Sequence, residues 1–134
     1  MSATTVIQAK RLGVYTCSPD TTLLAAAQRM TDEDISTLVV ADKDGYLAGI
    51  ITRTDLIRAY RTHPDWPGRR VEEFMNADVV TVGPTASLEE VADLLLARRI
   101  HRIVVVRYEG DRRRPVAIVS STDLVYHMVK ETQR

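Results

Sequence analysis

The sequence predicts an α+β fold built from two copies of one β-α-β-β-α repeat. First, the segment Ile50–Leu56 returns as Ile118–Leu124. In each copy an apolar run ends at a hydroxyl residue, and an aspartate stands three positions after that residue. Second, the two aspartates, Asp55 and Asp123, lie 68 positions apart in a chain of 134 residues. Third, strand-like apolar runs and helical apolar spacing alternate in the same order in both halves.

The remainder of the chain also repeats in register. An offset of 65 aligns the first half with the second, and a three-residue insertion then changes the offset to 68. The matched pairs are Val6 with Val71, Thr16 with Thr81, Pro19 with Pro84, Leu23 with Leu88, Ile35 with Ile100 and Val39 with Val104. These matches predict repeats at 6–60 and 71–129, joined by a linker at 61–70 that contains two prolines and a glycine.

Each repeat begins with a short strand and a helix. The strands, at 14–16 and 79–82, are each followed by a proline that stops them. Apolar residues then recur at i, i+3, i+4 and i+7 from Leu23 and from Leu88, which is typical of a helix with one buried face. Thr22 and Ser87 precede these helices and are expected to cap them.

A hairpin and a second helix complete each repeat. A buried strand at 38–40 or 103–106 leads through a turn at 42–45 or 109–111 into a return strand. The last helix then begins at the aspartate motif. Because one repeat alone leaves a face of its sheet uncovered, we expect the two repeats to bury those faces against each other about a pseudo-two-fold axis, which creates two related clefts.

Composition sets limits on function. Apolar residues make up 45% of the chain and charged residues 27%, which is ordinary for a globular protein. Eighteen basic and eighteen acidic residues cancel, so no overall field attracts nucleic acid or an anionic membrane. The inserted residues enlarge the second hairpin, and the run Arg112–Arg114 is expected to be a solvated loop. No apolar run is long enough to span a bilayer, and the expected location is the cytoplasm.

The repeated motif has two interpretations. Thr52 with Asp55, and Ser120 with Asp123, have the spacing of a helix-capping box. The same atoms suit a nucleotide, because a helix N-terminus binds phosphate and a carboxylate accepts hydrogen bonds from both hydroxyls of a ribose. Considered alone, these residues leave both interpretations open.

The two segments resemble the motif of CBS domains, the module named after cystathionine β-synthase. That motif is an apolar strand, Gly, two apolar residues, Thr or Ser, two variable residues and Asp. Gly49–Asp55 matches it, and Ala117–Asp123 matches with alanine in place of glycine. Since the resemblance covers roughly residues 6–129, it implies a tandem CBS-domain pair.

The resemblance implies an adenosyl ligand, such as AMP, ADP, ATP, S-adenosylmethionine or NAD, bound as a regulatory ligand and not as a catalytic cofactor. By position, the two aspartates would bind ribose, the neighbouring hydroxyls would lie near ribose or phosphate, and a His-Arg pair would reach phosphate. These site residues are Thr52, Thr54, Asp55, His101, Arg102, Ser120, Thr122 and Asp123.

The two copies are expected to form unequal sites. Ser36 and Thr37 stand where the second repeat has His101 and Arg102, so the first repeat supplies no cation there. Gly49 is expected to let a ligand approach the backbone, and the extra methyl group of Ala117 is expected to narrow the second cleft.

Nothing in the sequence supports catalysis. The three histidines form no catalytic triad or metal-ligand spacing, and the single cysteine, Cys17, excludes a multi-cysteine zinc site. The expected function is therefore a regulatory module that senses an adenine nucleotide and modulates a separate, unidentified partner protein. The alternative is a ligand-free oligomerisation scaffold. The resemblance also implies a homodimer formed through the helices at 22–34 and 87–98, or at 55–61 and 123–130.

Overall fold

The computed structural model describes residues 4–9 and 13–133, apart from the side chains of Ile7 and Ala9. The chain divides into two compact units. One is Val14–Val79, called here the 14–79 unit. The other, called here the 80–133 unit, contains residues 80–133 together with the described N-terminal residues up to Gly13. Each unit has its own three-stranded sheet and its own hydrophobic core.

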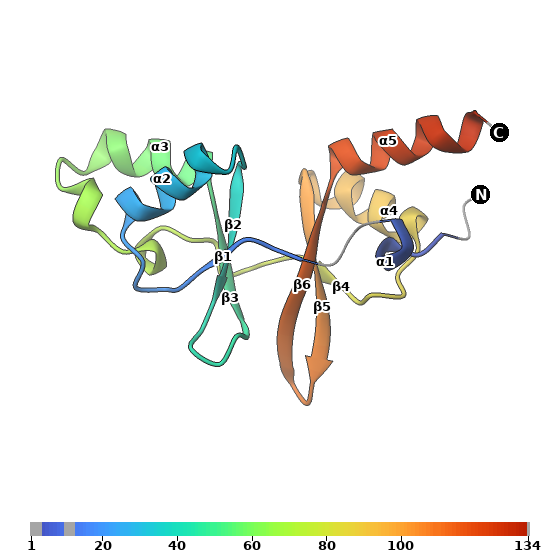
Figure 1. Cartoon of the computed structure of the whole chain (residues 1–134), viewed down its shortest axis with the longest axis horizontal. Helices are drawn as coiled ribbons and strands as arrows, with labels where there is room; N and C mark the ends of the chain where they lie inside the picture. The colour runs from blue at the N-terminus through green and yellow to red at the C-terminus, as the bar shows by residue number, and fades with distance from the viewer. Residues whose placement is uncertain (1–3, 10–12, 134) are drawn as a thin grey trace. The chain divides into compact units, whose positions relative to one another are not determined.

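The sheet of the 14–79 unit has the order β1-β2-β3. β1 (Thr16–Cys17) runs parallel to β2 (Thr37–Ala41), which pairs antiparallel with β3 (Leu47–Thr52). Helices α2 (Leu23–Asp32) and α3 (Arg53–Thr62) lie on the same face of this sheet (Figure 1). Two short 3-10 helices, η1 (Trp66–Gly68) and η2 (Val71–Glu73), follow in the segment that was predicted to be a linker and just beyond it.

The 80–133 unit repeats this order with a longer hairpin. β4 (Thr81–Val82) is parallel to β5 (Arg102–Glu109), which pairs antiparallel with β6 (Arg112–Ser120). Helices α4 (Leu88–Arg98) and α5 (Ser121–Thr132) cover one face, and the short α1 (Val6–Ala9) lies beside them (Figure 1). The predicted α+β class and the repeated β-α-β-β-α order are therefore confirmed.

The inserted arginines are in a strand and not in a loop, so that expectation was wrong. Arg112–Arg114 open β6, where Arg114 pairs across the hairpin with Arg107 and donates from Nε to Glu109 Oε2 at 2.6 Å. A tight turn at Gly110, with a φ of 68°, allows the two strands to continue to this point.

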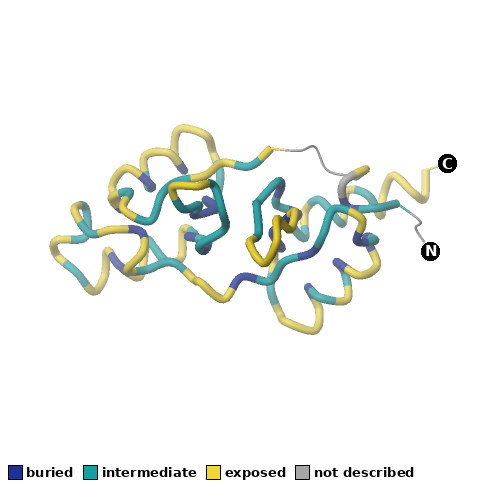
Figure 2. Tube along the Cα trace, turned by 90° about the horizontal axis from the view of Figure 1, so that it is seen from below, coloured by how far each residue is buried: buried dark blue, intermediate teal, exposed yellow. Residues whose placement is uncertain are grey.

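The core of each unit lies between its sheet and its helices. In the 14–79 unit, Leu38, Val40 and Ile51 are fully buried and share a cluster with Leu23 and Met30 of α2. Figure 2 shows that buried positions recur along the chain and are separated by intermediate and exposed stretches. Because side chains alternate along a strand, residues 37, 39, 50 and 52 lie on the opposite, helix-free face of the sheet.

The predicted N-caps are present. The Thr22 side chain accepts a hydrogen bond from Ala25 N–H at 3.1 Å, and the Ser87 side chain accepts one from Glu90 N–H at 3.1 Å. These bonds satisfy backbone donors that have no partner within the helix, which is why a hydroxyl residue at this position starts the helix.

The first residues of each repeat pack in the compact unit that contains the rest of the other repeat. Val6 N–H donates to Ala86 carbonyl at 2.8 Å, and Val71 N–H donates to Thr21 carbonyl at 2.8 Å. Donors and acceptors in these two bonds are related by the same offset of 65. Both valines are fully buried, Val6 in the core of the 80–133 unit and Val71 in the core of the 14–79 unit. The repeat bounds 6–60 and 71–129 thus remain a prediction about sequence repeats, while the compact units divide the chain differently.

Candidate functional site

The candidate site residues lie at two matching strand-to-helix junctions. Thr52 ends β3 and caps α3, and Ser120 ends β6 and caps α5. Their backbone angles are nearly the same, with φ and ψ of −120° and 167° at Thr52 and of −119° and 168° at Ser120. The repeat in sequence is therefore a repeat in local geometry.

Both aspartates complete a capping box. Thr52 N–H and Thr52 Oγ1 donate to Asp55 Oδ2 at 2.8 Å and 3.0 Å, and Asp55 N–H donates back to Thr52 Oγ1 at 3.4 Å. The bonds between Ser120 and Asp123 have corresponding lengths of 2.9 Å, 3.1 Å and 3.3 Å. The capping interpretation is confirmed, and it uses one carboxylate oxygen of each aspartate.

The second oxygen of Asp55 faces an arginine that was not among the predicted site residues. Arg58 Nη1 lies 3.3 Å from Asp55 Oδ1. The Arg58 side chain is 65% exposed, so water and salt screen this ion pair. The position that matches Arg58 in the second repeat is Tyr126, which carries no such charge. The two junctions therefore differ one helical turn beyond the motif.

Thr54 and Thr122 lie in the first turns of α3 and α5, and both are exposed. They lie at helix N-termini, where the helix dipole favours an anion, although the N–H groups of the neighbouring residues Arg53, Asp55, Ser121 and Asp123 already donate to protein oxygens. The aspartate in the same turn already supplies negative charge to the dipole. A nearby cation would therefore favour the binding of an anionic ligand here.

The structure separates the two members of the His-Arg pair. Arg102 is the first residue of β5 and stands directly opposite Ser120 on β6, so both side chains lie on the helix-free face. Burial lowers the pKa of Arg102, but an arginine stays charged at neutral pH. His101 precedes the strand, and its carbonyl accepts a hydrogen bond from Ser121 N–H at 2.9 Å.

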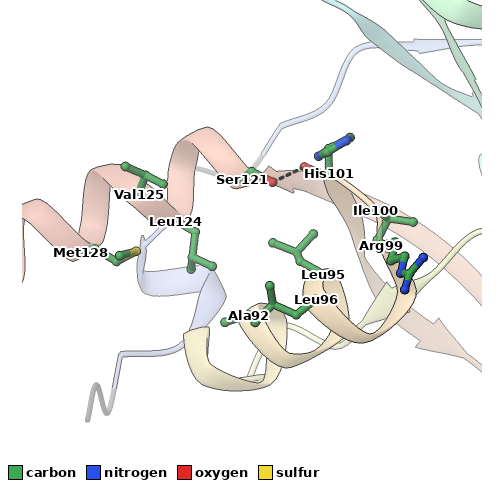
Figure 3. Close-up of a pocket in the computed structure, with 10 residues that line it drawn as sticks. All are labelled: Ala92, Leu95, Leu96, Arg99, Ile100, His101, Ser121, Leu124, Val125 and Met128. Atoms are coloured by element: carbon green, nitrogen blue, oxygen red, sulfur yellow. Dashed lines mark hydrogen bonds between the residues drawn. The ribbon is translucent and has the colours of Figure 1, made fainter.

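His101 lies at one end of a groove between α4 and α5 (Figure 3). The groove has a volume of about 630 Å³, and its lining includes the apolar side chains of Leu95, Leu96, Leu124, Val125 and Met128. A hydrogen bond of 3.3 Å from the Ser121 hydroxyl to His101 carbonyl closes that end. Arg102 and Ser120 therefore belong to one candidate site, while His101 borders a different, mostly apolar surface.

Sequence reasoning missed Thr37 as a candidate site residue. Thr37 stands opposite Thr52 in the register of β2 and β3, as Arg102 stands opposite Ser120. It is 7% exposed, and no hydrogen-bond partner of its Oγ1 is found among the described residues. The signal was available, because the offset of 65 aligns Thr37 with Arg102.

The interpretation of Gly49 and Ala117 as ligand-facing positions was wrong. Gly49 stands opposite Val40, whose side chain is part of the core beneath the helices. A Cβ atom at Gly49 would lie 2.8 Å from Asn76 carbonyl oxygen and 2.9 Å from Met75 Sδ. Ala117 is fully buried in the core of the 80–133 unit. Gly49 therefore provides room for the segment around Met75, and the methyl group of Ala117 does not narrow a site on the helix-free face.

Two further searches of the described part of the chain gave negative results. No group of three or more His, Cys, Asp and Glu side chains there is placed to hold a metal ion. None of the described helices combines the length and apolar character needed to cross a membrane.

Comparison with known proteins identifies relatives over most of the chain. The CBS domain model matches residues 9–62 and 71–130. An uncharacterised 17.7 kDa protein of Acidianus ambivalens is 30% identical over 123 residues, which are 91% of this chain and 71% of that protein. Inosine-5′-monophosphate dehydrogenase of Nitrosopumilus maritimus is 32% identical over 81% of this chain, but the match spans only 23% of that enzyme.

A solved structure also matches the fold. The CBS domain pair of the protein MJ0100, in complex with 5′-methylthioadenosine and S-adenosyl-L-methionine, superposes with a TM-score of 0.85. It is 26% identical in sequence, and the match covers 97% of this chain and 99% of that one.

Proposed function

The chain belongs to the CBS domain family, and on this premise we propose that it is a regulatory module that binds adenosyl compounds at the junctions of Asp55 and Asp123. The observation that carries the proposal is the pair of matching hydroxyl–aspartate junctions, each with one polar strand residue opposite the hydroxyl. The adenosyl ligands of the MJ0100 domain pair support the ligand class.

Each junction offers the groups that an adenosyl ligand needs. One carboxylate oxygen holds the helix cap, and the remaining acceptor capacity of the aspartate suits ribose hydroxyls. The exposed hydroxyls of Thr54 and Thr122 add donors and acceptors at the helix end. In the 80–133 unit, Arg102 offers a planar cation to a phosphate group.

Regulation requires that the ligand bind one conformation better than another. A ligand shifts an equilibrium only by its difference in affinity for the two states, typically about 1–3 kcal/mol. In this proposal the module performs no chemical step. It transmits occupancy to a separate partner protein in the cytoplasm, where adenosyl metabolites are made.

Ligand binding is tested first by mass spectrometry of small molecules released from freshly purified protein. Thermal unfolding with AMP, ATP and S-adenosylmethionine then measures the shift in Tm. We expect at least one compound to raise Tm, and we expect the Asp55→Ala, Asp123→Ala double variant to abolish that rise.

The matched control is Ser87→Ala, because Ser87 caps α4 away from both junctions. Loss of this cap costs about 1 kcal/mol of stability, similar to a cap lost at either junction. We expect the control to lower Tm and to keep the ligand-induced rise. If Ser87→Ala also abolished the ligand-induced rise in Tm, the aspartates would act only through the stability of their helices.

The helices also support a homodimer. Leu96, Val125 and Met128 on α4 and α5 are 79%, 55% and 57% exposed, although apolar side chains of this size are usually buried. They lie along the groove of Figure 3 and form a contiguous apolar surface. On α2 and α3, Leu24, Ile57 and Tyr60 are also exposed. We propose that a second copy of the chain covers these faces.

The dimer is tested by light scattering coupled to size exclusion. A Leu96→Glu, Val125→Glu variant is expected to have half the mass of the wild type, because two charges are placed in the interface. Tyr108→Glu, at an exposed aromatic residue of the β5–β6 hairpin, is the control and should keep the wild-type mass. A dimer that binds no adenosyl compound would instead favour a ligand-free scaffold, which the apolar groove also supports.

A further inference from the structure

The exposed apolar surfaces of the two units occupy equivalent positions. In the 80–133 unit, Val125 and Met128 are exposed on α5 along the α4–α5 groove. In the 14–79 unit, Ile57 and Tyr60 of α3 match them under the offset of 68 and are also exposed. We call these surfaces the α4–α5 face, around Val125 and Met128, and the α2–α3 face, around Ile57 and Tyr60. Each offers an apolar centre on which another chain can pack.

The charged residues at one end of these faces change sign between the repeats. Glu33 and Asp34, at the C-terminal end of α2, match Arg98 and Arg99 at the C-terminal end of α4 under the offset of 65. All four residues are exposed. Asp34 and Arg99 also share a left-handed backbone conformation, with φ of 50° and 53°. The two helix ends therefore have the same local shape and opposite charge.

The stability of α2 does not account for its acidic end. The C-terminus is the negative end of the helix dipole, so acidic side chains there are unfavourable. Asp32, Glu33 and Asp34 nevertheless follow one another at this end. Arg53 Nη2 lies 3.5 Å from Asp34 Oδ1, but the Asp34 side chain is 99% exposed, so water and salt screen this pair. Three acids beside one arginine leave this end of the α2–α3 face negative.

The opposite ends of the two faces also differ in charge. Glu89 of α4 and Glu131 of α5 line a second hollow that adjoins the α4–α5 groove. On the α2–α3 face the residue that matches Glu131 is His63, and the exposed Arg61 lies in the last turn of α3. The α4–α5 face thus runs from a basic end to an acidic end, and the α2–α3 face runs from acidic to basic.

We propose that the chain forms a homodimer in which the α2–α3 face of one copy packs against the α4–α5 face of the other. The acidic end of α2 then lies against the basic end of α4, and the apolar centres cover each other. Two such contacts between the same two chains give a closed dimer with two-fold symmetry. This inference rests on the homodimer proposed above and adds which faces meet.

Packing of each face against its own copy leaves the change of sign between the repeats without a reason. In that arrangement the charged end of α2 never meets the charged end of α4, so nothing favours opposite charges at equivalent positions. Complementary charges select the surface that docks, because like charges that are brought together oppose binding. Packing of unlike faces uses the difference at both ends.

Two charge-reversal variants of the full chain test the pairing of faces. One is Glu33→Arg, Asp34→Arg in the 14–79 unit, and the other is Arg98→Glu, Arg99→Glu in the 80–133 unit. Each variant alone brings like charges together in both contacts of the dimer. We expect the dimer Kd, measured by analytical ultracentrifugation at low salt, to rise about tenfold in each.

Mixing the two variants separates packing of unlike faces from self-packing. In a mixed dimer, opposite charges face each other again in both contacts. Native mass spectrometry should therefore show mainly the mixed dimer, and the mixture should recover the wild-type Kd. Because an unfolded chain cannot restore the dimer, this recovery also shows that both variants are folded.

The matched control is Arg107→Glu, Arg113→Glu, which makes the same change in net charge on the β5–β6 hairpin. This variant should keep the wild-type Kd, because both positions lie outside the helical faces. A Kd that rises equally in the control would mean that net charge, and not the pairing of faces, weakens the dimer, and the inference would fail.

Two other results would overturn the pairing of faces while leaving the homodimer in place. These are an unchanged Kd in either charge-reversal variant, and a raised Kd that mixing does not restore. The second result would indicate that each face packs against its own copy. If the wild type is a monomer at all concentrations, the proposed homodimer itself fails and this inference fails with it.

Discussion

At position 49 packing explains why the residue is glycine, although the surrounding sequence suggests contact with a ligand. Its missing side chain leaves space for Met75 and Asn76, and the backbone of Asn76 exchanges two hydrogen bonds with Ile50, of 2.8 Å and 3.0 Å. The outer edge of β3 is thereby paired at this point. A backbone atom cannot move aside as easily as the end of a flexible side chain, so substitution here should be costly.

We expect Gly49→Ala to lower the free energy of unfolding by about 1–3 kcal/mol, because the new Cβ overlaps the carbonyl oxygen of Asn76. Urea denaturation followed by circular dichroism measures this loss. Gly68→Ala is the control, since a Cβ atom at Gly68 has no neighbour within 4 Å. Equal stability of the two variants would show that the contact at Gly49 is relieved without cost.

Cys17 provides a second test at the residue scale. Burial raises the pKa of its thiol from 9.0 to about 11, and the nearby Arg29 opposes this only partly. The folded state thus holds the thiol proton more tightly than the unfolded state does. Below pH 9.0 both states keep the proton, so the thiol gives no pH dependence there.

We expect the stability of the wild type to fall as pH rises from 9.0 to about 11, because the unfolded chain ionises Cys17 first. Urea denaturation at several pH values measures the fall. The Cys17→Ala variant keeps all other titrating groups and should show a shallower decline. Parallel curves for the two proteins would contradict the assigned pKa direction.

At the scale of elements, α3 and α5 share a cap but differ in packing. α3 buries Ala59, whereas none of the residues of α5 is buried. Most helical stability in proteins comes from packing of an apolar face. In the described chain, α5 therefore depends more on its capping box and on whatever covers Val125 and Met128.

Ser120→Ala should cost about 1 kcal/mol of stability, because it leaves the N–H of Asp123 without its acceptor. We also expect faster amide hydrogen exchange in the first turn of α5. Ser120→Thr restores the hydroxyl, as the first repeat does naturally with Thr52, and should restore protection. Protection that is unchanged in Ser120→Ala would show that packing alone holds this helix.

At the scale of the whole molecule, the exchange of leading segments decides which continuous part of the chain contains all the residues of one hydrophobic core. The 14–79 unit is continuous in sequence and contains Val71, which fills its core. The 80–133 unit needs Val6 from the other end of the chain. A division of the chain at the repeat boundaries would therefore remove a fully buried valine from each core.

A fragment of residues 14–79 should accordingly be more ordered than a fragment of equal length, 1–66, that contains the whole of the first predicted repeat. Both fragments retain Trp66, so tryptophan fluorescence and circular dichroism can compare them directly. The 1–66 fragment lacks Val71, Phe74 and Met75, which all pack in the core of the 14–79 unit. A chain of this length is only marginally stable, so this loss should be decisive. Greater order in the 1–66 fragment would contradict the assignment of Val71 to that core.

Sequence alone determined the features that depend on neighbouring residues. Helix starts at Thr22 and Ser87, the hairpins and the two capping boxes all follow from spacing over a few positions, and the repeat made each of them visible twice. The candidate hydroxyls and aspartates could be found for the same reason. Local hydrogen bonds and side-chain periodicity act within one turn or one strand.

Only the tertiary structure decided which residues from different strands face each other. Strand register placed Thr37 beside Thr52 and Arg102 beside Ser120, whereas His101, which precedes β5, lines the α4–α5 groove. Packing likewise assigned Gly49 and Ala117 to cores and exchanged Val6 and Val71 between units. Such contacts join residues that are distant along the chain, and whether they form depends on the shape of the whole core.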